Sequence, residues 1–82
     1  MFEVTIAIGL KKGITDPEGA TTLKALHLLE FEQVETVVTK RLFILMVDEK
    51  DEKVMKKKAE EMCQKLLTNP VIHDYTITIK RI

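Results

Sequence analysis

Three side chains in this sequence could take part in bond-making: Cys63, His27 and His73. A cysteine becomes a nucleophile when a neighbouring base removes its proton. Cys63, however, falls in the apolar stripe of a lysine-rich helical pattern, and burial in apolar surroundings raises the pKa of a thiol and makes it inert. The sequence supplies no third group that would orient either histidine as a general base. We therefore expect structural roles for these three residues and no catalytic residue in this chain.

The sequence also indicates no metal or phosphate site. One cysteine and two histidines do not reach the ligand spacing of a zinc site. The three glycines, Gly9, Gly13 and Gly19, fit neither GxxxxGK[ST] nor GxGxxG, the loops that hold phosphates. We therefore predict no metal and no cofactor bound by this chain itself.

Composition excludes several classes of partner. The chain has 13 basic and 13 acidic residues, whereas nucleic-acid binders usually carry a net basic surface. The longest apolar run, Leu42 to Val47, is far shorter than a membrane span. The beginning of the chain lacks the basic region of a signal peptide, and the single cysteine suits a reducing compartment. We expect a cytoplasmic protein that binds neither nucleic acid nor membrane.

Two alternating stretches predict strands, and two helical patterns lie between them. Phe2 to Leu10 alternates apolar and polar residues, and so does Val71 to Ile82. Asp16 followed by proline predicts the N-cap and first position of a helix over residues 17–29. A second helical stripe runs from about residue 52 to 68 and is ended by an Asn-Pro pair.

The segment from Val34 to Asp48 is the most informative. It is rich in β-formers and reads either as one strand or as a hairpin turning near Thr39 to Arg41. As one strand of 15 residues, at about 3.3 Å each, it would span on the order of 50 Å, so it should bend or enter a neighbour's sheet. Its second half is apolar on both faces and needs cover on both. The predicted oligomer interface is Leu42, Phe43, Ile44, Leu45, Met46 and Val47.

The order of elements is β-α-β(β)-α-β in a single domain, residues 1–82. We predict an α+β fold, ferredoxin-like in outline, with two helices on one face of a mainly antiparallel sheet. A domain of this length buries only roughly 60% of its unfolded surface. Without disulfides or a metal, a partner subunit is the remaining source of stability, so we expect oligomerisation.

Several motifs together resemble one family. They are Lys12-Gly13, Asp16-Pro17-Glu18-Gly19, Ala25-Leu26-His27, Met62 to Leu67, Asn69-Pro70-Val71-Ile72 and Asp74-Tyr75. In this order and at these spacings they resemble the PurS subunit of phosphoribosylformylglycinamidine synthase, over essentially the whole chain. Members often carry Gly-Lys where this chain has Thr39-Lys40, so the resemblance favours no particular turn there.

The resemblance implies a complex of three proteins that makes an amidine from formylglycinamide ribonucleotide in purine biosynthesis. A large synthetase subunit and a glutaminase subunit use ATP, Mg and glutamine, and the small subunit bridges them and supports ammonia transfer. Members are homo-oligomers, dimers above all, whose long middle strand contributes to sheets shared between protomers. For this chain the resemblance implies a homo-oligomer, a dimer in the first place and a tetramer as the other option.

By the same resemblance, partner-binding candidates are Asp16, Pro17, Gly19, Asn69, Pro70 and His73. Three alternatives stay open: a ferredoxin-like oligomeric module that binds a small regulatory metabolite, a small free-standing enzyme using Cys63 or His27, and a nucleic-acid module.

Overall fold

The computed structural model describes all 82 residues. In chain order the elements are β1 (Phe2–Leu10), α1 (Pro17–Leu28), β2 (Arg41–Val47), α2 (Glu52–Met62), the π-helical turn η1 (Cys63–Leu67) and β3 (His73–Arg81). The strands form one sheet in the order β2-β1-β3, and both neighbours pair antiparallel with β1. The predicted α+β class, the element order and the antiparallel sheet are confirmed. Neither helix is long and apolar enough to cross a membrane.

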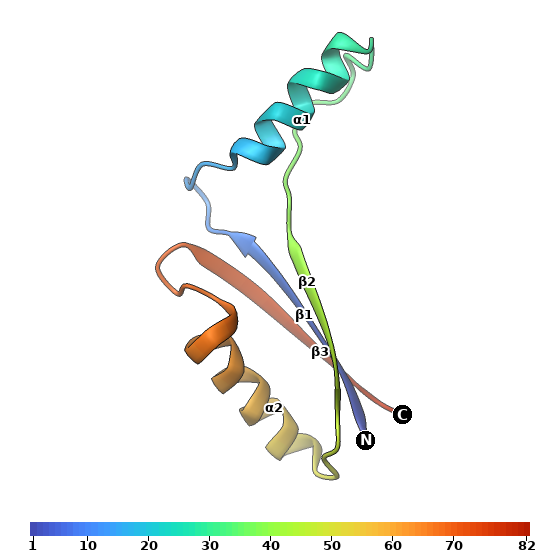
Figure 1. Cartoon of the computed structure of the whole chain (residues 1–82), viewed down its shortest axis with the longest axis vertical. Helices are drawn as coiled ribbons and strands as arrows, with labels where there is room; N and C mark the ends of the chain where they lie inside the picture. Colours follow the sequence, from blue (N-terminus) through green and yellow to red (C-terminus); the bar gives the residue numbers. More distant parts are fainter.

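The core lies between one face of the sheet and α2. The alternation of β1 places its even-numbered residues on this face, where α2 and η1 pack against them (Figure 1). The fully buried cluster is Phe2, Val4, Ile6, Ile8, Met55, Ala59 and Cys63. The apolar half-buried residues of β2 and β3 surround this cluster. The other face of the sheet carries no helix.

The first helix does not lie on the sheet, and in this detail the structure differs from the prediction of two helices on one face. Helix α1 extends beyond the end of the sheet, so α2 is the only α-helix that packs on the sheet (Figure 1). The reason is the return path of the chain. After α1 the chain runs back beside the helix in extended form and enters β2 only at Arg41, which pairs with Ile8 near the end of β1. We call residues 11–40 the arm.

The arm also decides between the two readings of the middle segment. Residues 34–40 are extended, make no strand pairing within this chain and contain no hairpin. Pairing with β1 stops at Arg41 because β1 itself ends at Leu10 and turns away into the arm. The middle segment is therefore one continuous stretch whose first half leaves the chain's own sheet.

The far end of α1 closes with a backbone motif that usually contains glycine. The Phe31 N–H donates to the Leu26 carbonyl at 2.9 Å, and the Glu30 N–H donates to the His27 carbonyl at 3.1 Å. Together these bonds form a Schellman cap. Glu30 has a φ of 73°, a left-handed conformation that a side chain disfavours.

Helix α2 ends differently from the sequence prediction of a continuous helix to residue 68. Its N-cap is Asp51, whose carboxylate accepts from the Lys53 N–H at 2.9 Å. After Met62 the helix widens into η1, and both the backbone N–H and the hydroxyl of Thr68 donate to the Cys63 carbonyl. This widening turns the chain toward β3.

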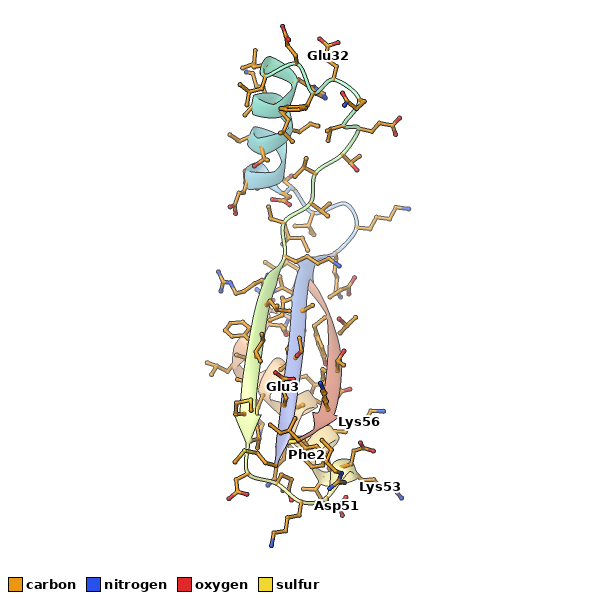
Figure 2. All side chains as sticks on the ribbon, turned by 90° about the vertical axis from the view of Figure 1, so that its right-hand side faces the viewer. Phe2, Glu3, Glu32, Asp51, Lys53 and Lys56 are labelled. Carbon is orange, nitrogen blue, oxygen red and sulfur yellow. The ribbon has the colours of Figure 1, made fainter.

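The two ends of the chain lie together. The Ile82 N–H donates to the Met1 carbonyl at 3.1 Å. This pair is at the end of the sheet near Phe2, and Figure 2 shows the arm, with Glu32 near its tip, at the opposite end. The molecule measures 50 × 28 × 14 Å.

Candidate functional site

The two groups of predicted partner-binding residues lie at the same end of the sheet. Here β1 ends, β2 and β3 begin, and the base of the arm meets the turn that precedes β3 (Figure 1). The Lys11 N–H donates to the Ile72 carbonyl at 2.8 Å and joins the two loops directly. We call residues 68–72, between η1 and β3, the second turn. The start of α1 and the second turn therefore lie near each other on one copy of the chain.

The Asp16 carboxylate closes the base of the arm. It accepts hydrogen bonds from the Gly19 N–H at 2.9 Å and from the Thr39 N–H at 2.8 Å, and the Thr39 hydroxyl donates to it at 3.0 Å. The bond from the Gly19 N–H, followed by the bond from the Thr39 N–H, lowers the pKa of Asp16. Asp16 thus caps α1, as predicted, and also ties it to the returning segment, which the sequence did not reveal.

Gly19 has a structural reason to be glycine. It is the only buried residue of α1, and a Cβ added there would lie 2.5 Å from the Val37 carbonyl oxygen. The returning backbone can pass this close to the first turn of α1 only because Gly19 has no side chain. Pro17, its neighbour in that turn, is exposed and free to meet a partner.

The turn before β3 is organised by Asn69. Its side-chain oxygen accepts from the Val71 N–H at 3.0 Å, and its own N–H donates to His73 Nδ1 at 2.8 Å. Pro70 is exposed at the tip of this turn. His73 is therefore held with Nδ1 as acceptor, which leaves Nε2 as the protonated nitrogen of the neutral ring.

Two apolar side chains beside this turn were missed at the sequence level. Leu66 is 82% exposed and Val71 is 78% exposed. Leu66 was assigned to the apolar stripe of the second helix, but η1 rotates it outward because a π turn changes the angle between successive residues. Exposed apolar side chains such as these and Pro70, within six residues of one another along the chain, are suited to a protein contact.

The residues capable of chemistry are not assembled into a nucleophile–base pair. Cys63 is fully buried in the core, and burial raises the pKa of its thiol, helped by the nearby Glu60 carboxylate. His27 lies on the arm, where its Nε2 bonds to the Val34 carbonyl at 2.8 Å. One polar pair could not be found from the sequence pattern: the Tyr75 hydroxyl donates to Glu60 at 3.0 Å, and this bond raises the pKa of Tyr75.

The six residues of the predicted oligomer interface divide by parity. Phe43, Leu45 and Val47 are half-buried on the α2 face of the sheet. Leu42, Ile44 and Met46 point to the other face and are 59%, 57% and 59% exposed. One half of this strand thus has cover within the chain, and the other half has none.

Comparison with known proteins identifies the family of this chain over nearly its whole length. A family profile for PurS, described as phosphoribosylformylglycinamidine (FGAM) synthase, matches residues 3–81. The chain belongs to the PurS family. Among curated members, the phosphoribosylformylglycinamidine synthase subunit PurS of Methanocaldococcus jannaschii is 44% identical over 82 residues, which cover 100% of this chain and 99% of that protein. The corresponding subunit of Bacillus subtilis is 32% identical and covers 100% of this chain and 96% of its own length.

Solved structures of PurS share the fold. The crystal structure of Methanocaldococcus jannaschii PurS superimposes with a TM-score of 0.92 at 45% identity, covering 100% of this chain and 99% of that one. That protein is described as one of the subunits of formylglycinamide ribonucleotide amidotransferase in the purine biosynthetic pathway. A chain in a structure of PurLQS from Thermotoga maritima superimposes with a TM-score of 0.87 over 96% of both chains at 22% identity, a likeness of fold.

Proposed function

We propose that this chain is the non-catalytic small subunit of a phosphoribosylformylglycinamidine synthase and that it bridges the glutaminase and synthetase subunits. The observation that carries this proposal is membership of the PurS family over residues 3–81. In this proposal ATP, Mg and glutamine are bound by the partner subunits. The small subunit contributes by holding two active sites in register, so that ammonia passes between them without release into bulk water, where it would be protonated.

A homo-oligomer is part of the proposal, and the dimensions of one copy support it. The accessible surface is 6475 Å², whereas a compact 9.4 kDa protein exposes about 5,000 Å². The radius of gyration is 16.3 Å, against about 12 Å for a compact domain of this length. The excess of about 1,500 Å² is comparable with what one partner buries in an extensive, permanent interface.

The arm and the open sheet face supply the surfaces for this self-association. Residues 34–40 are extended and make no strand pairing within this chain, which favours pairing with a strand of another copy. The exposed half of β2, with Leu42, Ile44 and Met46, continues the same stretch. A second copy could pair one of its strands with residues 34–40 and cover the exposed apolar face of β2 at the same time.

Bridging requires further surface that self-association leaves free. The second turn, with Asn69, Pro70 and the exposed Val71, lies on the β3 side of the sheet, away from β2. We assign it, with the start of α1 at Pro17, to contacts with the larger subunits.

The test mixes the purified synthetase and glutaminase subunits and measures formation of the amidine product with and without this chain. Glutamine as nitrogen donor should give product only when the chain is present. With ammonium chloride as nitrogen donor, which bypasses the glutaminase, the rate of product formation should depend on the chain much less. Equal glutamine-dependent rates with and without the chain would show that it bridges nothing.

A further inference from the structure

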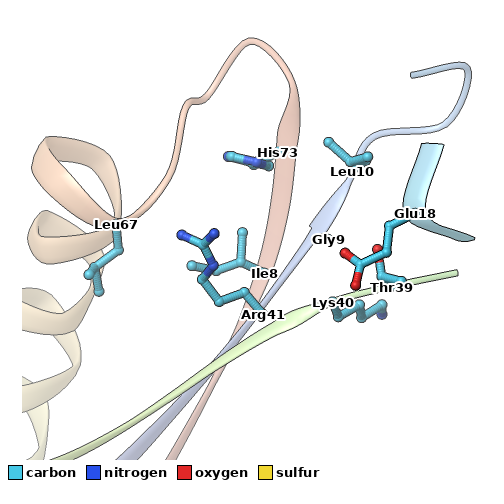
Figure 3. Close-up of a pocket in the computed structure, with 9 residues that line it drawn as sticks. All are labelled: Ile8, Gly9, Leu10, Glu18, Thr39, Lys40, Arg41, Leu67 and His73. Atoms are coloured by element: carbon cyan, nitrogen blue, oxygen red, sulfur yellow. The ribbon is translucent and has the colours of Figure 1, made fainter. Parts of the chain in front are cut away.

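A hollow of about 320 Å³ lies at the junction of sheet, arm and η1. It is within the size range of small-molecule sites. Its lining combines residues from five different parts of the fold: Ile8, Gly9, Leu10, Glu18, Thr39, Lys40, Arg41, Leu67 and His73 (Figure 3).

Two hydrogen-bond donors, Arg41 and His73, line this hollow together with the apolar side chains of Ile8, Leu10 and Leu67. Arg41 opens β2 and His73 opens β3, and Figure 3 shows both side chains reaching toward Leu67. In β1, Ile8, only 5% exposed, pairs with Arg41, and Leu10 pairs with His73. Arg41 is exposed and His73 is half-buried, so both donors can be reached from solvent.

The donor identity of His73 is fixed by the turn behind it. Its Nδ1 accepts the Asn69 N–H at 2.8 Å, so the neutral ring carries its proton on Nε2, the nitrogen directed away from that turn. Arg41 has no carboxylate partner among the ion pairs of the chain, which are Lys58–Glu49 and Lys65–Glu61. Glu18, the one acidic residue of the lining, lies with Thr39 and Lys40 at the opposite end of the hollow (Figure 3).

We propose that this hollow binds the phosphate group of a small phosphomonoester, held by the Arg41 guanidinium and the His73 Nε2–H. A phosphate group offers three terminal oxygens in different directions, so it can accept from Arg41 and His73 at the same time. A carboxylate has two oxygens in one plane, and a guanidinium fork uses both of them. Gly9 and Lys40 also line the hollow. The Lys40 side chain lies across β1 at Gly9, and a Cβ at Gly9 would come within 3.2 Å of it, so glycine leaves room for Lys40.

The experiment titrates inorganic phosphate into the full-length ¹⁵N-labelled chain at constant ionic strength and follows the amide signals by NMR. We expect saturable shifts at the starts of β2 and β3 and weaker effects of acetate. Glycerol 3-phosphate, a simple phosphomonoester, should bind at least as tightly as inorganic phosphate. Because it uses the chain alone, this test is independent of the bridging role.

Two variants remove the donors separately. Arg41→Gln should weaken phosphate binding by about tenfold or more. His73→Asn keeps an acceptor for the Asn69 N–H but removes the Nε2 donor, so it should weaken binding while the turn stays folded. Lys56→Gln, at the other end of the molecule near Asp51, is the charge-matched control and should bind like the parent (Figure 2). Unsaturable shifts, equal affinity for acetate, weaker binding of the phosphomonoester, or unchanged affinity in both donor variants would overturn the proposal.

Discussion

One carboxylate, that of Asp16, connects parts of the chain 23 residues apart. It caps α1 through the Gly19 N–H and holds the returning segment through Thr39. The sequence predicted the cap, because Asp before Pro is a local signal. It could not predict the contact with Thr39, because that depends on how the arm folds back.

Replacing Asp16 by alanine should destabilise the protein about twice as much as replacing Asp51, the N-cap of α2. Asp51→Ala removes bonds to the first turn of its own helix. Asp16→Ala removes a cap and also leaves the Thr39 N–H without its partner. Thermal unfolding of both variants at neutral pH measures the difference. Equal losses would mean that the link to Thr39 adds nothing.

Gly19→Ala should lower the free energy of unfolding by about 1–2 kcal/mol. Alanine in a helix is normally the more stable choice by about 1 kcal/mol. Here its Cβ would lie 2.5 Å from a backbone oxygen, so the returning segment must move. Gly9→Ala is the matched control, because its Cβ would meet only the flexible Lys40 side chain. Denaturant unfolding of both variants decides; a more stable Gly19→Ala protein would contradict the close approach.

At the scale of elements, local patterns were sufficient wherever a local cause decides the structure. Period-two alternation located β1 over Phe2–Leu10, and the Asn-Pro pair located the end of the helical stretch that α2 and η1 form together, although not the change to π-helix after Met62. The placement of α1 was not predictable, because its apolar stripe says that the helix needs cover but not what covers it. Leu23 and Leu26 are half-buried within the arm, whereas Leu29 is 67% exposed.

The loop between β2 and α2 should make the protein sensitive to acid. Lys58 donates to Glu49 at 2.9 Å, and this bond, with N–H donors from Lys50 and Asp51, lowers the pKa of Glu49 from 4.5 to about 2. The folded state therefore favours the charged carboxylate. Its contribution to stability is complete above pH 4.5 and is lost as the pH falls toward about 2.

Melting temperature measured against pH checks this expectation. Glu49→Gln should reduce the fall in melting temperature between pH 4.5 and 2. The fall that remains should come from Asp16, whose pKa is also lowered in the folded state, so that its contribution is lost in the same direction. Glu61→Gln removes an exposed carboxylate whose bridge to Lys65 is 3.9 Å long, and it should leave the profile nearly unchanged. A Glu49→Gln profile as steep as the parent's would be inconsistent with the bond to Lys58.

At the scale of the whole molecule, the buried core is small. Only 8 of 82 residues are buried, and all three strands share one helical cover. Length and two-sided strand character predicted this shortage from the sequence. The candidate site could be predicted only in part. The start of α1 and the second turn were proposed by resemblance, whereas the positions of Arg41, Leu66 and Val71 depend on how η1 and the arm are placed in the fold.

Substituting the open face should dissociate the proposed homo-oligomer. Ile44→Glu places a charge at the centre of the exposed apolar row of β2, so self-association should weaken by at least about tenfold while the strand remains folded. Leu66→Glu introduces the same charge at an exposed apolar position on η1 and is the control. Sedimentation equilibrium measures the mass of both variants. A parent protein of monomer mass, or an Ile44→Glu protein of unchanged mass, would contradict the assignment.

The hydrogen bond between Ile82 and Met1 has a practical consequence. Because both termini leave the molecule side by side, a short linker could join them and new ends could be opened elsewhere, which makes circular permutation geometrically simple. Because the termini lie at the end of the sheet opposite the arm, an affinity tag or fluorophore on either terminus would lie some distance from the arm, the second turn and the hollow (Figure 1). Surface immobilisation through such a tag would leave those regions facing the solution.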